Sequence, residues 1–265
     1  MHKRQRILVV ALFACLAAEA QTTTTRRISA PESFYDDASI NDPGVVGVSM
    51  GAGYREVSAG HDFGAPSLDL SVGITRRLEL NASSGYAKSR FEDLRISGLS
   101  DSYFSAKVLL VREGDRMPAI AIKPTIEVLG RPSVAYDLLA PARVNLMIPV
   151  AIEKSSSWSR TYLMAGYNTR GIAFASLVNE LNVWSKFTPS VILAYGRLTR
   201  DLGLISDLNL NRSRLDVEGS GSFAVAPHWS VYIGAGRSLG RTDPNSTSFS
   251  VSGGLGYNFR LWGHR

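Results

Sequence analysis

The sequence predicts an all-β fold, an antiparallel up-and-down transmembrane β-barrel of about 12 strands, with 10 strands as the alternative. Three observations favour this fold. Apolar residues recur with a period of two along most of the chain, short and long connections alternate, and the chain closes on an alternating strand. A hydrophobic fraction of 45% is too low for a bundle of membrane helices, but it suits strands that have one apolar face.

The first 20 residues have the pattern of a secretory signal peptide. Basic residues between His2 and Arg6 precede the apolar stretch Ile7–Ala14, and Ala18–Ala20 offers small residues for cleavage. Cys15, the single cysteine of the chain, also gives a rough match to a lipidation box, but Phe13 stands where such boxes prefer a small residue. We therefore expect cleavage after residue 20 and a mature chain without a thiol.

The polar stretch 21–43 predicts a flexible periplasmic leader, which contains the acidic pair Asp36-Asp37. Residues 44–265 then form the barrel. Without a thiol the mature chain can form neither a disulfide nor a thiolate metal site, and we expect no cofactor. Its basic residues are spread along the chain without blocks, so we expect no nucleic-acid partner.

About twelve alternating segments follow the leader. Each has roughly 10 to 13 residues, the length that a tilted strand needs to cross a bilayer. The face opposite the apolar one carries glycine, serine, asparagine and charged residues, so we expect apolar residues toward lipid and polar residues inside a closed barrel. The segments begin near residues 45, 66, 78, 102, 118, 143, 160, 172, 189, 213, 229 and 247.

Two features weaken the pattern. Pro124 and Pro149 fall inside expected strands, where each predicts a bulge or a break because proline cannot donate to the ladder. The segment 172–184 alternates poorly, because Asn179 shares a face with Leu177.

The connections predict which end of the barrel faces which compartment. Arg76-Arg77 and the other turns of its series are short, whereas connections of the other series, such as 56–64 and 87–101, are longer. Short turns are typical of the periplasmic end of outer-membrane barrels. Four tryptophans mark the short-turn ends of segments and four tyrosines lie near the long-loop ends, as interfacial girdles would: Trp158, Trp184, Trp229, Trp262, Tyr54, Tyr86, Tyr103 and Tyr195.

Alternation predicts that eleven charged residues point into the lumen. Charges of both signs can line a hydrated path and set its selectivity. They can equally pair with one another and seal the barrel, since buried charges must be compensated. We therefore expect a channel, with a sealed structural or adhesive barrel as the alternative. The candidates are Arg55, Asp69, Glu79, Lys107, Lys123, Glu127, Arg143, Glu153, Arg197, Asp216 and Glu218.

The last strand carries a further signal. Ser252, Gly254, Tyr257 and Phe259 resemble the C-terminal signal by which the insertion machinery recognises bacterial outer-membrane barrels. The resemblance implies two partners, that machinery and the lipid of the outer membrane.

Three other stretches resemble the outer-membrane family associated with phenol-degradation (MetA pathway) operons. They are "PGVVGVSMGAGY", "LDLSVGITRRLELNASSGYA" and "AIAIKPTIEVLG". The general pattern of the family extends over residues 44 to 260. The resemblance implies a porin-like transport protein for small compounds, hydrophobic ones among them, and it supplies no site residues.

An outer-membrane hydrolase is the third functional class, and it requires a histidine beside a serine or an aspartate. His61-Asp62, expected in the first long loop, is the pair that could activate water at the outer rim. A solvated loop histidine is the preferred interpretation, and we expect no enzyme.

Overall fold

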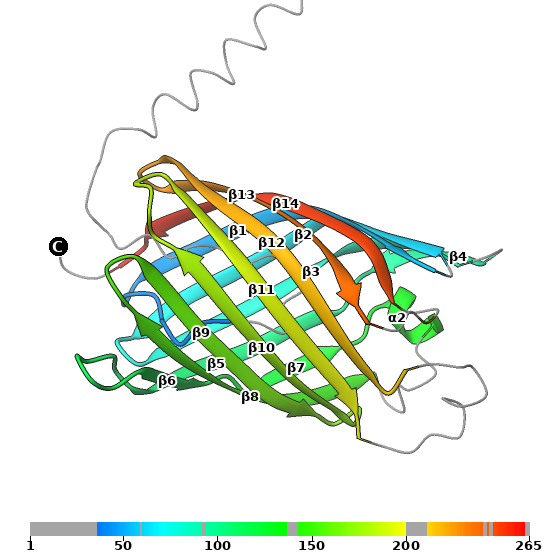
Figure 1. Ribbon diagram of the computed structural model, residues 1–265, viewed down its shortest axis with the longest axis horizontal. Coiled ribbons are helices and arrows are strands. Elements are labelled where there is room, and N and C mark those ends of the chain that lie inside the picture. The colour runs from blue at the N-terminus through cyan, green and yellow to red at the C-terminus, as the bar shows by residue number, and fades with distance from the viewer. Residues whose placement is uncertain are drawn as a thin grey trace, which may run out of the picture.

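The structure, a computed structural model, describes residues 36–262 apart from residue 59 and the segments 92–93, 137–142, 200–210, 241–242 and 244–245. The predicted signal peptide, residues 1–20, and most of the predicted leader lie outside the described residues. The described part of the chain forms one sheet of antiparallel strands that closes on itself (Figure 1). Among the described residues no helix is both long and apolar enough to cross a membrane.

The strands follow one another around the sheet almost in chain order. They are β1 (Val45–Val57), β2 (Gly60–Thr75), β3 (Leu78–Phe91), β4 (Leu94–Leu99), β5 (Ser102–Val111), β6 (Ala119–Ile122), β7 (Thr125–Val128), β8 (Val144–Ser155), β9 (Ser159–Asn168), β10 (Ile172–Leu181), β11 (Phe187–Leu198), β12 (Ser213–Ala226), β13 (Trp229–Leu239) and β14 (Thr247–Arg260). One short helix, α2 (Arg131–Tyr136), interrupts the series.

The fourteen strands build a barrel of twelve. Strands β4 and β5 pair one after the other with β3, so together they occupy one position in the barrel. Strands β6 and β7 do the same between β5 and β8. The barrel closes where β1 pairs with β14 from Val45↔Arg260 to Val57↔Thr247. Because closure leaves no open edge, every strand finds its hydrogen-bond partners without water, and the predicted fold class is confirmed.

The two faces of the strands are inverted relative to a soluble protein. Along β8, Ile148 is 49% exposed on the outside, whereas Met147 and Ala151 are buried inside. The outer face of the other strands is likewise apolar and exposed, as at Leu70 and Ile233. An apolar outer surface of this kind is stable only in contact with lipid. It is the surface that a barrel in the outer membrane presents to the bilayer.

Prolines break one strand and leave its neighbour intact. The gap between β6 and β7 contains Pro124, so the expected break is confirmed there. Pro149, in contrast, lies inside an uninterrupted β8 and keeps its register with Gly166 of β9. On its other side the ladder stops between Ile122↔Val150 and Thr125↔Met147, so the expected break is confirmed on that side of β8. The carbonyl of Pro149 accepts a hydrogen bond from the amide of Lys123 at 3.0 Å, which turns its missing donor toward the gap. The two prolines thus share one interruption of the ladder.

Strand β10 explains the poor alternation seen in the sequence. Phe174, Ser176 and Val178 are buried on its inner face, whereas Leu177 is exposed on the outside. Asn179 also faces outward, and its amide donates to the hydroxyl of Thr161, its partner on β9, at 2.7 Å. The polar outward residue therefore has a cross-strand hydrogen bond of its own.

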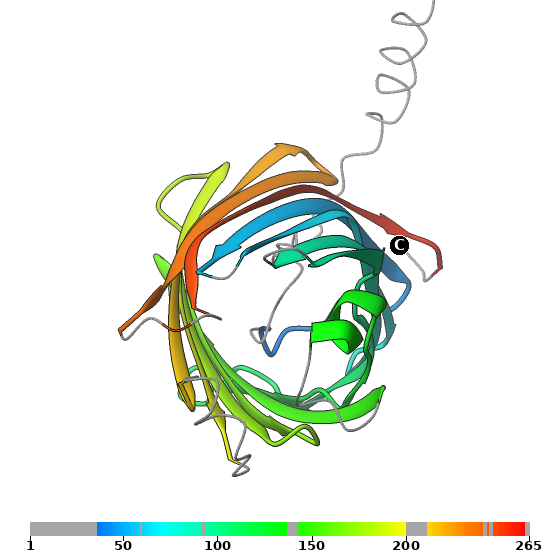
Figure 2. The same ribbon diagram turned by 90° about the vertical axis from the view of Figure 1, so that its right-hand side faces the viewer.

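Two of the expected long loops are instead extensions of the barrel strands. Strands β1 and β2 stay paired to Val57↔Gly60, and β3 and β4 stay paired to Phe91↔Leu94. The expected loops 56–64 and 87–101 are therefore wrong, and β2 begins at residue 60 rather than 66. The helix α2 lies at the same end, within the ring of strands when the barrel is viewed along its axis (Figure 2).

Candidate functional site: the charged lumen

A segment of the predicted leader, residues 36–44, lies inside the barrel. It passes from the middle of the lumen to the short-turn end, where the amide of Gly44 donates to the carbonyl of Gly73 at 2.8 Å. A Cβ atom on Gly73 would lie 2.5 Å from the carbonyl oxygen of Asn41, so the segment rests directly on the wall of β2. Residues 36–43, which the sequence interpretation assigned to the leader, thus lie inside the barrel.

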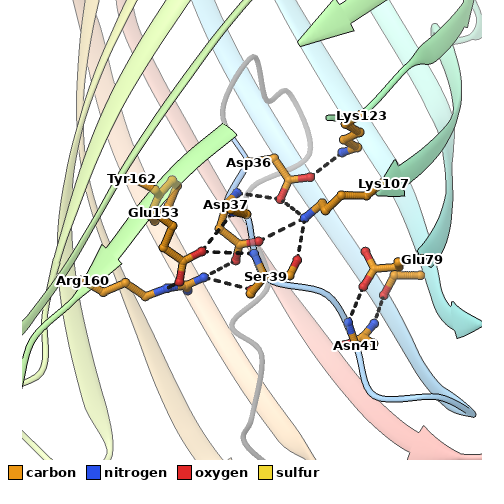
Figure 3. Close-up of polar contacts among 12 residues, drawn as sticks. Asp36, Asp37, Ser39, Asn41, Glu79, Lys107, Lys123, Glu153, Arg160 and Tyr162 are labelled. Atoms are coloured by element: carbon orange, nitrogen blue, oxygen red, sulfur yellow. Dashed lines mark hydrogen bonds and ion pairs between the residues drawn. The ribbon is translucent and has the colours of Figure 1, made fainter. Parts of the chain in front are cut away.

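Two adjacent carboxylates of this segment alternate with three cations from the barrel wall (Figure 3). Asp36 contacts the ammonium of Lys123 at 2.5 Å and that of Lys107 at 2.8 Å. Asp37 contacts Lys107 at 3.0 Å and the guanidinium of Arg160 at 2.5 Å. The three cations come from β5, from the gap between β6 and β7, and from β9, so the segment links three barrel strands.

The backbone of the segment is held as well. Its amides at Ala38 and Ser39 donate to one carboxylate oxygen of Glu153, at 3.0 and 3.1 Å. The amide of Asn41 donates to Glu79 at 2.6 Å. Charge-assisted bonds of this kind are about twice as strong as neutral ones. The barrel therefore holds the segment through its main chain and through its two acidic side chains.

Arg160 connects the segment to the wall behind it. Its guanidinium contacts Glu153 at 2.6 Å and Glu180 of β10 at 3.5 Å, and it lies 5.3 Å from the ring centre of Tyr162. Tyr162, Val178 and Ile192 form a buried apolar cluster on this side of the lumen. The ion pairs thus lie against a packed wall that keeps them partly dry.

A second polar cluster lies toward the long-loop end. Arg170, in the turn between β9 and β10, donates to Glu127 of β7 at 3.3 Å, and the hydroxyl of Tyr103 donates to the same carboxylate at 3.2 Å. Asp101 accepts the amide of Gly130, which fixes the start of the connection that carries α2. Tyr103, expected in an aromatic girdle, therefore points into the lumen.

The opposite wall is lined by small residues. The inward positions of β1, β12, β13 and β14 carry Gly51, Gly53, Ser220, Ser222, Gly234, Gly236, Ser252 and Gly254. Tyr232 is a large side chain on the same wall, and its ring lies over Gly254, because a Cβ there would be 2.6 Å from the ring. The lumen therefore has a charged, filled side and a side with small side chains.

Other predicted lumen residues line this second side and the rim. Asp69 accepts a hydrogen bond from Ser49 at 3.1 Å, and Asp216 contacts Arg214 at 2.8 Å and Ser238 at 2.6 Å. The side chain of Glu218 lies beside Gly234, where an added Cβ would clash with its carboxylate. Charges of both signs thus occur on both walls.

Three predicted residues lie away from the central cluster. Arg55 contacts Asp62 at 2.5 Å in the paired extension of β1 and β2. Arg143 is exposed in the bend before β8. The expectation that Arg197 lines the lumen is wrong, because it shares the outer face of β11 with Tyr195 and Leu193 and is itself exposed.

The sequence interpretation missed several residues that complete the lumen. Alternation along β9 and β10 would have placed Arg160 and Glu180 inside, since both lie in register with buried neighbours. No comparable signal exists for Asp36 and Asp37, which precede the first strand, or for Arg170, which belongs to a turn.

His61 and Asp62 do not form a catalytic pair. Both lie in β2 rather than in a loop, and successive residues of a strand point to opposite faces. Asp62 is bound to Arg55, whereas the ring of His61 lies 6.0 Å from that of Tyr54. Within the described residues, no group of three His, Cys, Asp or Glu side chains is arranged to hold a metal ion.

The residues of the expected insertion signal lie where β14 closes the barrel. Tyr257 and Phe259 are on the outer face with ring centres 5.6 Å apart, and Tyr257 also packs against Trp229 at 4.6 Å. Ser252 and Gly254 of the same strand pair with Gly53 and Gly51 of β1. The two aromatic residues thus lie at the short-turn end of the barrel, on the last strand, which pairs with β1 and closes the sheet.

Comparisons with known proteins agree on the fold. No protein-family model matches the sequence. No curated protein matches it either. Among solved structures, the COG4313 outer membrane channel from Pseudomonas putida F1 is 12% identical with a TM-score of 0.65, over 86% of this chain and 100% of that one.

Two porins are similar to a lesser degree. The NanC porin has a TM-score of 0.58 at 12% identity, over 79% of this chain and 98% of that one. The KdgM porin, solved in complex with disordered oligogalacturonate, has a TM-score of 0.54 at 12% identity, over 80% of this chain and 99% of that one. The chain therefore has the fold of an outer-membrane β-barrel, the architecture that these channels and porins share.

Proposed function

We propose that the protein is a passive channel for small solutes in the outer membrane. One observation carries the proposal: inward-facing charges keep part of their surface accessible inside a closed barrel. The side chain of Asp216 is 29% exposed and that of Lys123 is 22% exposed. Water can therefore reach both groups inside the barrel, as a hydrated path requires.

The side chains that line the lumen indicate which solutes can pass. Carboxylates, hydroxyls and ammonium groups favour small polar or charged solutes, which exchange water for these groups at little cost. Small hydrophobic compounds, which the resemblance to the phenol-degradation family implies, are the alternative. The inner face also has two apolar clusters, one of Tyr162, Val178 and Ile192 and one in which Leu109, Met164 and Phe174 pack with Ala38 of the inserted segment. Because both clusters are buried, whereas the accessible groups named above are charged, polar solutes are favoured.

A sealed structural barrel is the second candidate, and the inserted segment favours it. Residues 36–41 fill one side of the lumen, and Glu79 and Lys107 beside them are almost completely buried. Ion pairs of this kind can close a barrel as well as line a path. A barrel with no pore would have a structural or adhesive role.

Planar-bilayer recording separates the two candidates. The purified mature protein is reconstituted, and single-channel current is recorded in potassium chloride from 0.1 to 1 M, in addition to swelling of liposomes in sugars of increasing size. The proposal predicts discrete current steps and swelling that falls with solute size. The absence of current and of swelling at every salt and solute would favour the sealed barrel.

We also propose how the chain reaches the membrane. Residues 1–20 act as a cleaved signal peptide, and Ser252, Gly254, Tyr257 and Phe259 act as the signal for the insertion machinery. The Phe259→Ala variant is expected to accumulate outside the outer membrane, because the outward ring at the closing seam is lost. An unchanged yield of inserted protein would contradict the role of Phe259 in the insertion signal. Cleavage after residue 20 is tested separately, by the mass of the mature chain.

A further inference from the structure

We propose that Lys107, Lys123 and Arg160 form a binding subsite for a solute that carries two neighbouring acid groups, and that the Asp36 and Asp37 carboxylates of the chain itself occupy this subsite in the resting barrel. The inference rests on the proposed channel function and specifies its solute class. It starts from the alternation of cation and carboxylate along the line Lys123, Asp36, Lys107, Asp37, Arg160 (Figure 3).

The cations belong to the wall, whereas the carboxylates belong to a segment that no strand pairing holds. Lys107 is on β5 and Arg160 on β9, so barrel hydrogen bonds fix their positions. Residues 36–44 precede β1 and make no ladder with any strand. A solute can therefore replace the two carboxylates without breaking a hydrogen bond between barrel strands, while the amides of Ala38 and Ser39 keep their bonds to Glu153.

The contacts of the segment define what a solute must offer. Each carboxylate bridges two cations, with oxygen–nitrogen distances between 2.5 and 3.0 Å. Lys107 is shared by both, so a solute that replaces them needs two acid groups close enough to meet at one ammonium. Glu79 lies directly across the ladder from Lys107, and Glu153 contacts Arg160. A solute with a single carboxylate would therefore compete with these two wall acids for the same cations.

The subsite is reachable from the lumen on one side. The Lys123 side chain is 22% exposed and that of Arg160 is 15% exposed, whereas Lys107 between them is at 1%. An acid group can thus meet Lys123 first and displace Asp36 before the inner contacts break. Stepwise exchange of this kind lets binding stay strong without a large barrier to release.

The tethered carboxylates set how strongly a solute must bind. A segment joined to the barrel presents its acid groups at an effective concentration in the millimolar range. A free solute can bind only those barrels in which the segment has left the subsite. Its apparent affinity is therefore the intrinsic affinity multiplied by the fraction of such barrels. Weakening the segment should raise the apparent affinity for a free diacid, and this expectation is the basis of the test.

The experiment compares four full-length forms of the mature protein: wild type, Asp36→Asn with Asp37→Asn, Asp36→Asn alone, and the double asparagine form that also carries Lys123→Gln and Arg160→Gln. Binding of succinate is measured by calorimetry in detergent, with acetate and succinamide as matched probes. Current and reversal potential are measured in bilayers under a salt gradient. The change in gel migration on heating shows that each form is folded.

We expect the double asparagine form to bind succinate at least ten-fold more tightly than the wild type, with acetate and succinamide bound weakly by both. Its current should rise, its selectivity should shift toward anions, and succinate should reduce the current. The form lacking Lys123 and Arg160 charges should lose these effects. If the double form does not fold, Asp36→Asn alone should show the same changes on a smaller scale through Lys123.

The two proposals fail in different ways. Succinate bound no more tightly by the asparagine forms than by the wild type, or bound equally without the Lys123 and Arg160 charges, would overturn the subsite even if the barrel conducts. Binding as expected in a barrel that passes no current would support the subsite and overturn the channel. A current that shifts toward cations in the double asparagine form would also contradict the subsite.

Discussion

Lys107 and Glu79 lie directly opposite each other on neighbouring strands β5 and β3, and each residue is 0% exposed inside the barrel. In a soluble protein such a pair would be an exception, because charges avoid the interior. Here it follows from the inversion of the two faces, since the charged residues of these strands point inward, away from lipid. The pair also supports the inserted segment, because Glu79 accepts the amide of Asn41 and Lys107 binds both aspartates.

Replacing Lys107 with Met should destabilise the barrel by about 3–5 kcal/mol, because the change leaves buried acids without a compensating charge. Glu79→Gln should be milder, since the amide keeps a hydrogen-bond acceptor for Asn41. The double variant should cost less than the sum of the two single changes. The urea midpoint of unfolding in lipid vesicles, followed by tryptophan fluorescence, measures all three. Strict additivity would show that the two side chains do not interact.

Gly166 on β9 is required by the close approach of the Pro149 backbone and the Phe174 ring. A Cβ atom there would lie 2.8 Å from Cα of Pro149 and 2.7 Å from the ring of Phe174. Gly166→Ala should therefore lower the free energy of unfolding by about 1–3 kcal/mol, the usual cost of overpacking. Gly196→Ala is the matched control, because nothing lies within 4 Å of the added atom. The same urea titration compares them, and equal midpoints for both variants would contradict the packing.

The shared interruption at Pro124 and Pro149 predicts which backbone donors matter. Pro149→Ala should change stability little, because the donor that it restores faces the gap between β6 and β7. Val150→Pro, one residue further, should destabilise the barrel by several kcal/mol, because Val150 pairs with Ile122 and with Ala165 and the lost hydrogen bond cannot be replaced by water in the bilayer. The yield of heat-modifiable folded protein after refolding into vesicles measures both. A tolerated Val150→Pro would contradict the register of β8.

The fold was predictable because the bilayer imposes a strict rule on each strand. The alternation of Val144, Ile148 and Ile152 with Asn145 and Glu153 leaves one arrangement, apolar outward and polar inward, and the structure has it. The paired extensions were not predictable in the same way, because beyond the membrane no lipid enforces alternation. Backbone pairing carries β1 and β2 to Val57 and Gly60, with the Arg55–Asp62 ion pair across them.

The charged lumen was predictable only where strands supply it. Glu153 and Lys107 follow from alternation, but the partners that bind Lys107 come from Asp36 and Asp37, in a polar stretch without periodicity. Arg197 fits a polar position in its segment, yet it lies on the outer face, where a long side chain near the rim can reach water. Contacts between a strand and a distant segment depend on tertiary structure, which local pattern does not encode.

The most direct test of the inverted barrel uses a chain that begins at residue 21, which contains no thiol because Cys15 is the only cysteine in the sequence. Cysteine is introduced singly as Ser220→Cys on the inner face of β12 and as Ile233→Cys on the outer face of β13, and each protein is folded into lipid vesicles. The account predicts that a charged, water-soluble thiol reagent modifies the first variant, whereas the second resists it and its attached fluorophore is quenched by lipid-bound quenchers. Modification of the Ile233 variant by the charged reagent, with lipid quenching at position 220, would contradict the account.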